Sequence, residues 1–149
     1  MERFDHEKLD VYQLAVEFLA LVGRMVDSGP LSKCRLSAVK HLDDASQSIA
    51  NNIAEGNGKR STADRARYLE IARGSALECA ACLDGLVARE RLSVDQVRTA
   101  KALLIRIVSM LSRMVDKLVA SRRGSSTGGA AASTSTSTST STGSRRSST

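Results

Sequence analysis

Basic side chains gather in the middle of the chain, where the sequence also predicts a turn between two helices. The members of this group are Lys59, Arg60, Arg65, Arg67 and Arg73. Lysine and arginine bind the phosphate groups of nucleic acids through charge and charge-assisted hydrogen bonds. Contacts of this kind carry little sequence information, so the group predicts RNA or DNA binding that depends weakly on sequence and strongly on salt.

The same residues also fit a solvated protein surface. Acidic neighbours lie close by at Asp64 and Glu70, and the basic residues lack the interleaved aromatic side chains that stack on bases. A second basic group consists of Lys33, Arg35 and Lys40. It is expected at the start of the second predicted helix, whose other end leads into the turn. The alternative to nucleic-acid binding is therefore a protein-interaction scaffold, in which a partner docks on an apolar helix face and the charges serve solubility.

Cys79 and Cys82 have the spacing found in redox and metal sites. On a helix, both thiols lie on one face beside Leu83 and Leu86, where cysteine packs as a small apolar residue. A zinc site needs four ligands, and the sequence offers no second pair and no neighbouring histidine. Core packing is the favoured interpretation, and no metal or other cofactor is predicted. Together with Cys34 the cysteines number three, which, without a secretory segment, predicts a reducing, cytoplasmic location.

Other catalytic arrangements are not supported by the sequence. Some four-helix bundles bind two metal ions through Glu and Glu-x-x-His motifs, but Glu55, Glu70 and Glu78 are not followed by such a histidine. Neither histidine lies in a motif that orients it against a serine or cysteine. Gly56-Asn-Gly58 lacks the wider pattern of a phosphate-binding loop. The sequence therefore predicts a protein that is not an enzyme.

Apolar residues at helical spacing organise the first 121 residues. The pattern predicts helices over about 8–27, 31–55, 62–89 and from Ser93 onward. The fourth has the most regular spacing, in alternating steps of three and four: Val97, Ala100, Leu104, Ile107, Leu111, Met114 and Leu118. With 3% aromatic residues and one proline, the composition favours an all-α fold. Short links predict an up-down-up-down antiparallel four-helix bundle, and extra apolar residues on the last helix predict self-association.

The link between the second and third helices has its own signals. Gly56 and Gly58 suit the left-handed conformation that ends a helix, and Ser61 with Asp64 approximates a capping box. Polar residues share faces with apolar ones on both helices, which places at least some of them at a helix–helix seam. These residues are Asn52, Glu55, Ser75 and Glu78, with the two glutamates expected to pair with Asn52, Ser75 or Arg73. Gly74 lies inside a helix, which predicts close packing or a special contact there.

The composition changes after Ser121. Residues 122–149 contain four arginines, no acidic residue and a run of alternating serine and threonine. They lack the apolar side chains that offset the entropy of ordering, so a disordered basic tail is predicted. The chain carries a net charge of +6, of which this tail contributes +4 and residues 1–121 contribute +2. No apolar run reaches the length required to cross a bilayer.

Two motifs resemble a known family. They are Ser48-Ile-Ala-Asn-Asn-Ile-Ala-Glu-Gly56 and Tyr68-Leu-Glu-Ile-Ala-Arg-Gly-Ser-Ala-Leu-Glu78. Together with the opening Leu9-Asp-Val-Tyr12, they resemble the 23S rRNA intervening-sequence protein family over roughly Leu9 to Leu118. Ala50-Asn51 stands where that family often has Pro-Ser, and Arg65 stands where an aromatic residue is common.

The resemblance implies a four-helix bundle that forms closed homo-oligomers, often pentamers. It also raises the expectation of nucleic-acid binding, because the family includes proteins encoded within ribosomal RNA insertions. A related bundle is the accessory protein of reverse transcriptases in diversity-generating retroelements. We therefore expect a non-catalytic oligomer that binds RNA or DNA, with a reverse transcriptase as a further candidate partner.

Overall fold

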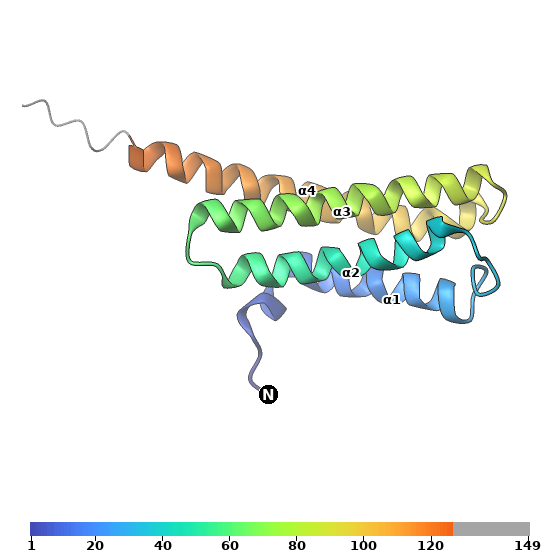
Figure 1. Ribbon diagram of the computed structural model, residues 1–149. Coiled ribbons are helices and arrows are strands. Elements are labelled where there is room, and N and C mark those ends of the chain that lie inside the picture. Colours follow the sequence, from blue (N-terminus) through green and yellow to red (C-terminus); the bar gives the residue numbers. More distant parts are fainter. Residues whose placement is uncertain (127–149) are drawn as a thin grey trace, which may run out of the picture.

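Four α-helices are present in the computed structural model, which describes residues 1–126. They are α1 (Asp10–Asp27), α2 (Ser37–Gly58), α3 (Thr62–Ala88) and α4 (Val94–Ser126), preceded by the 3-10 turn η1 (Asp5–Lys8). Each helix packs antiparallel against the next, and α4 also packs against α1, which closes the bundle (Figure 1). The predicted all-α, up-down-up-down four-helix bundle is confirmed.

The core forms from the apolar stripe of each helix. On α4 the predicted stripe is buried from Val97 to Leu111, whereas Met114 and Leu118 are half-buried. Phe18 of α1 is fully buried. The hydroxyl of Ser46, also fully buried, donates to the carbonyl of Asp43 at 2.7 Å. Within residues 1–126 every buried side-chain nitrogen or oxygen has a hydrogen-bond partner, as a stable core requires.

The start of the second helix differs from the prediction. α2 begins at Ser37, whereas the sequence placed the start near Leu31. The intervening residues form turns in which the Leu31 N–H donates to the carbonyl of Met25 at 2.9 Å. Leu31 is thereby buried against the core, with 1% of its surface exposed. Lys33 and Arg35 consequently lie in the α1–α2 link and not on α2.

The end of the fourth helix also differs from the prediction. α4 continues to Ser126, so Arg122 to Ser126, expected to be disordered, are helical. Arginine has a high helix propensity, and the Ser125 hydroxyl donates to the carbonyl of Arg122 at 3.0 Å. The rest of the predicted tail, residues 127–149, lies outside the described residues. None of the helices in residues 1–126 combines the length and apolarity needed to cross a membrane.

The turn between α3 and α4 contains an unusual backbone conformation. Glu90 has a φ of 57°, and it is the one non-glycine residue with positive φ in residues 1–126. This conformation reverses the chain, so that the N–H of Arg91 donates to the carbonyl of Leu86 at 2.9 Å. Leu92 then enters the core with 4% of its surface exposed. Glu90 occupies a position where residues without a Cβ are favoured.

Candidate nucleic-acid interface

The α2–α3 turn is short and held by backbone and cap contacts. The N–H of Lys59 donates to the carbonyl of Gly56 at 3.2 Å, and the Ser61 hydroxyl accepts from the N–H of Asp64 at 3.3 Å. The predicted serine cap is therefore confirmed. The carboxylate of Asp64 does not return the contact in the described part of the chain, so the capping box is half formed. Lys59 and Arg60 lie in this link.

Gly56 brings the two helices together at this turn. It is not left-handed as predicted, because no glycine in residues 1–126 has a positive φ. It lies in the last turns of α2, buried, where a Cβ would come within 2.9 Å of the Tyr68 Cβ and 3.4 Å of the Arg65 carbonyl oxygen. Its lack of a side chain therefore permits close packing of α2 on α3.

Lys59 contacts residues of both helices that flank the turn. Its ammonium group lies 3.1 Å from the Glu55 carboxylate and 4.7 Å from the centre of the Tyr68 ring. The hydrogen bond to Glu55 raises the pKa of Lys59, and hydrogen bonds from Lys59 and then Tyr68 lower the pKa of Glu55. The partner predicted for Glu55 is thus wrong, since the glutamate pairs with the lysine one turn later. Much of the Lys59 charge is balanced locally.

Arg60, Arg65 and Arg67 differ from Lys59 in their surroundings. None of the three makes an ion pair or side-chain hydrogen bond with any residue between Met1 and Ser126. Arg60 and Arg67 are exposed, and Arg65 is half-buried where α3 meets α2. The positive end of the α3 dipole lies in the same turn and also attracts anions. These three guanidinium groups are available to an external phosphate.

Arg73 does not belong to this group. Eight residues separate it from Arg65, which corresponds to about 12 Å along a helix. Its guanidinium contacts the Glu70 carboxylate at 3.0 Å. The structure therefore brings together Lys59, Arg60, Arg65 and Arg67 at the turn and leaves Arg73 apart and paired.

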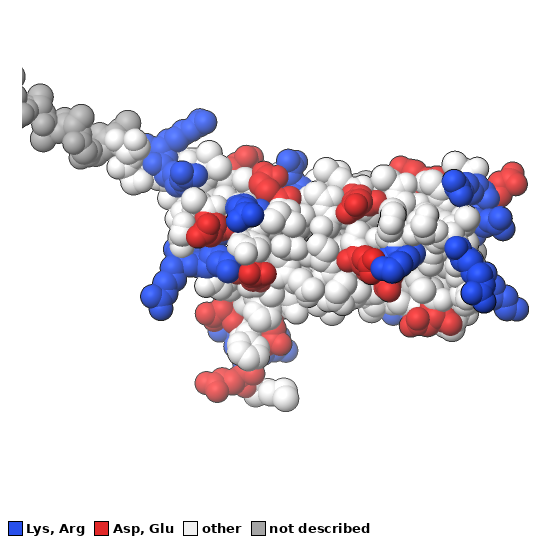
Figure 2. Space-filling view, in the orientation of Figure 1, with Lys and Arg blue, Asp and Glu red and all other residues white. Residues whose placement is uncertain are grey.

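The antiparallel arrangement adds further basic residues that the sequence analysis did not include. The C-terminal end of α4, with Lys117, Arg122 and Arg123, lies at the same end of the bundle as the α2–α3 turn (Figure 1). Lys and Arg gather over both ends of the visible face, with acidic residues among them (Figure 2). The predicted topology could have indicated this, because in an antiparallel bundle the end of the fourth helix lies beside the start of the third. We call the end that holds the α2–α3 turn the basic end.

The predicted polar seam is formed in part. The hydroxyl oxygens of Ser48 and Ser75 lie 2.9 Å apart, and the Asn52 amide donates to the Ser48 carbonyl at 2.8 Å. Ser48 belongs to α2 and Ser75 to α3, so this contact joins the two helices. Ser75 is 7% exposed, which places the contact in a buried part of the seam. Glu78 is exposed and pairs with none of its three predicted partners, Asn52, Ser75 and Arg73. The close packing predicted at Gly74 is wrong, because it faces open space with no atom within 4 Å of an added Cβ.

Cys79 lies in the core, as the interpretation from sequence proposed. It is fully buried, and its thiol lies 3.9 Å from the carbonyl oxygen of Leu42. Burial raises the pKa of Cys79 to about 12. Cys82 is half-buried, and burial raises the pKa of its thiol too. In residues 1–126 no three His, Cys, Asp or Glu side chains are placed to share a metal ion.

The raised pKa of Cys79 predicts how stability depends on pH. The unfolded chain loses this proton near the ordinary pKa of 9.0, well before the folded chain does. The free energy of unfolding should therefore fall above pH 9, by at most about 1.4 kcal/mol per pH unit from this group. In urea unfolding between about pH 8 and pH 10.5, Cys79→Ala should show a weaker decline than the wild type. Equal slopes for Cys79→Ala and wild type would refute the prediction.

Comparison with known proteins gives a match to a family model and matches to solved structures. Residues 7–113 match the model of the 23S rRNA-intervening sequence protein family. A crystal structure from Bacteroides thetaiotaomicron, described as a protein with unknown function from the S23 ribosomal protein family, superposes with a TM-score of 0.65. The two chains are 21% identical, over 71% of this chain and 95% of the other. No curated protein sequence matches the chain.

Proposed function

Because the chain belongs to the 23S rRNA-intervening sequence protein family, we propose that it is a non-catalytic, self-associating protein that binds the phosphate backbone of RNA or DNA. The observation that carries the proposal is the set of three unpaired arginines at the basic end, Arg60, Arg65 and Arg67. In an oligomer this set is repeated, and simultaneous contacts strengthen binding beyond that of one subunit. The name of the family, which refers to sequences that interrupt 23S rRNA, favours RNA.

Self-association would use the groove between α3 and α4. Leu77 and Ile105 flank it with 51% and 66% of their surfaces exposed. The groove has a volume of about 190 Å³, and its lining is almost entirely apolar, including Ala76, Ala80 and Val108. Exposed apolar surface of this kind is typical of contact regions between proteins. A second copy of the chain is the proposed occupant, with a pentamer favoured by the family resemblance.

Placing a charge in this groove should prevent assembly. In Ile105→Glu, a charged carboxylate would be taken out of water at the proposed contact, and the cation in the groove, Lys101, already pairs with Asp84. The association constant should therefore fall at least about tenfold. Size-exclusion chromatography with light scattering should show an oligomer for wild type and smaller species for the variant at equal concentration. Thr99→Glu, on an exposed part of α4 outside the groove, should assemble as wild type does. A monomeric wild type would refute the proposed self-association.

Fluorescence anisotropy with a labelled, structured RNA tests the proposed function. The full chain and a chain ending at Ser126 should both bind at micromolar or lower concentration, and affinity should fall steeply across a salt series. Binding by the full chain alone would assign the activity to residues 127–149. Absence of binding by either chain would refute the proposal.

The apolar groove also supports a second candidate function, a protein-interaction scaffold without a nucleic-acid role. Its partner would occupy the α3–α4 groove, so binding would be insensitive to salt and lost in Ile105→Glu. A reverse transcriptase is instead a proposed further partner of the nucleic-acid-binding oligomer, in line with the accessory role in retroelements that the family resemblance implies. A gene beside a reverse transcriptase, or inside a ribosomal RNA insertion, would favour a role in nucleic-acid metabolism.

A further inference from the structure

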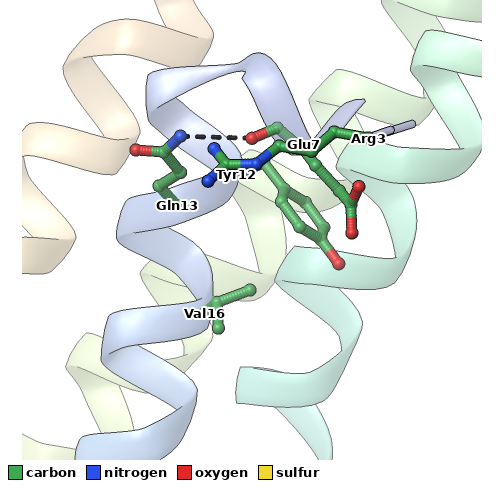
Figure 3. Close-up of a pocket in the computed structure, with 5 residues that line it drawn as sticks. All are labelled: Arg3, Glu7, Tyr12, Gln13 and Val16. Carbon is green, nitrogen blue, oxygen red and sulfur yellow. Dashed lines mark hydrogen bonds between the residues drawn. The ribbon is translucent and has the colours of Figure 1, made fainter. Parts of the chain in front are cut away.

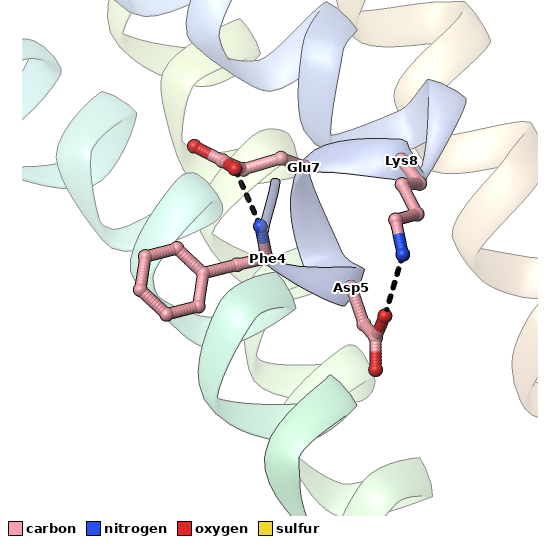
Figure 4. A network of polar contacts seen from close by, with 4 residues as sticks. All are labelled: Phe4, Asp5, Glu7 and Lys8. Carbon is pink, nitrogen blue, oxygen red and sulfur yellow. Dashed lines mark hydrogen bonds and ion pairs between the residues drawn. The ribbon is translucent and has the colours of Figure 1, made fainter. Parts of the chain in front are cut away.

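The segment before α1 is held in a defined shape by short polar contacts. The N–H of Phe4 donates to the Glu7 carboxylate at 2.7 Å, and Lys8 pairs with Asp5 at 2.9 Å (Figure 4). The Gln13 amide donates to the carbonyl of Glu7 at 3.1 Å and joins the segment to α1 (Figure 3). These contacts hold the backbone from which the Phe4 ring projects.

Three rings form a row that runs from this segment to the first turn of α1. The rings of Phe4 and His6 are nearly parallel, with an angle of 9° and centres 5.7 Å apart. The His6 ring meets the Tyr12 ring edge to face, with centres 4.8 Å apart. Phe4, at the outer end of the row, is 73% exposed, so a large part of the ring is open to a ligand. An aromatic ring held in this way can stack on a nucleobase.

The row of rings lies at the basic end of the bundle. η1 packs against α1 and α2, beside the end of α2 that leads into the α2–α3 turn (Figure 1). The chain has four Phe and Tyr residues, and all except the buried Phe18 lie at this end. Phe4 and His6 precede the turn by more than fifty residues, so the sequence alone does not place their rings beside its basic residues.

The surface beside the rings has a hollow but little net positive charge. A hollow of about 420 Å³ is lined by Arg3, Glu7, Tyr12, Gln13 and Val16 (Figure 3). The guanidinium of Arg3 has no ion pair within residues 1–126. Acidic residues outnumber basic ones in the first ten positions of the chain. The segment would therefore contribute stacking, and the arginines of the α2–α3 turn would contribute the charge.

We propose that the exposed ring of Phe4, backed by His6, is a stacking platform for an unpaired base of a single-stranded nucleic acid whose backbone lies along the basic end. This proposal rests on the proposed function and narrows its ligand to segments with unpaired bases. Bases inside a duplex are already stacked on each other and present only their edges, whereas unpaired bases offer their faces to aromatic side chains.

The test uses the full chain with a single-stranded RNA of about twelve nucleotides and with a duplex of the same length. Phe4→Ala should weaken binding of the single strand by roughly fivefold to 150-fold, the range for one stacked base. The slope of affinity against salt should stay at the wild-type value, because no charge is lost. Phe4→Trp should restore the affinity, and 2-aminopurine in the single strand should be quenched by wild type and by Phe4→Trp. Thermal unfolding should be unchanged, since the ring is outside the core.

The outcomes separate this proposal from the one on which it rests. Equal losses on single strand and duplex, or full affinity in Phe4→Ala, would refute the stacking platform while leaving salt-dependent binding at the basic end intact. Failure of wild type to bind any nucleic acid would refute both. Loss in Phe4→Ala that is confined to the single strand, with rescue by tryptophan, supports the platform.

Discussion

Replacing Arg60, Arg65 and Arg67 together by glutamate should lower the affinity for RNA by at least about a hundredfold at low salt. Each arginine is free of ion pairs in the described part of the chain, so its charge is available to a phosphate. Loss of each phosphate contact should also reduce the slope of log affinity against log salt by about 0.7 to 0.9. Anisotropy titrations at several salt concentrations measure both quantities.

A matched control changes the same number of charges at the other end of the bundle. Lys33, Arg35 and Arg89 are exposed and have no ion pair within the described residues. Replacing these three by glutamate changes net charge equally, so any effect of total charge alone appears in both variants. Equal losses of affinity in the two triple variants would show that the turn is not the binding site.

Two glycine-to-alanine substitutions should change stability in opposite directions. Gly56→Ala should lower the free energy of unfolding by about 1–3 kcal/mol, because the added Cβ would lie 2.9 Å from the Tyr68 Cβ. That atom is bound directly to the backbone of α3, so the two helices must separate for the methyl group to fit. Gly74→Ala should raise the free energy of unfolding by about 0.5–1 kcal/mol, because its Cβ meets open space inside a helix.

Urea unfolding monitored by circular dichroism gives both values under identical conditions. Because both substitutions add one methyl group within a helix, the intrinsic gain in helix propensity is similar, and the difference between them reports the packing at Gly56. Stabilisation by Gly56→Ala would show that α2 and α3 are less closely packed at the turn than the structure indicates.

The fold was predictable because one periodic signal runs through each helix. The steps of three and four from Val97 to Leu118 define which face of α4 is buried, and the structure follows them. The start of α2 was not predictable in this way. Leu31 and Leu36 continue an apolar pattern that suits a helix, but Leu31 is buried by a turn whose backbone contacts involve Met25 and Gly29.

The candidate site was predictable where neighbours in sequence are neighbours in space. Arg60, Arg65 and Arg67 were found in this way, and Ser61 was recognised as a helix cap. Side-chain pairing was harder to predict, since several alternative partners are within reach of one long side chain. Lys59 could have faced solvent, yet it lies between Glu55 and Tyr68. The sequence could not assign Phe4 and the end of α4 to the candidate site, because segments far apart in the chain must pack together to bring them to the α2–α3 turn.

The left-handed backbone conformation of Glu90 affects which substitutions the protein can accept during evolution. It lies in the α3–α4 turn, at the opposite end of the bundle from the α2–α3 turn. Glycine or asparagine accepts this backbone conformation with less strain than glutamate, so either would be a stabilising substitution far from the proposed interface. A protein with glycine or asparagine at position 90 can tolerate destabilising substitutions near Arg65 that change which ligand it binds. Relatives with altered basic ends should therefore carry glycine or asparagine at this position more often.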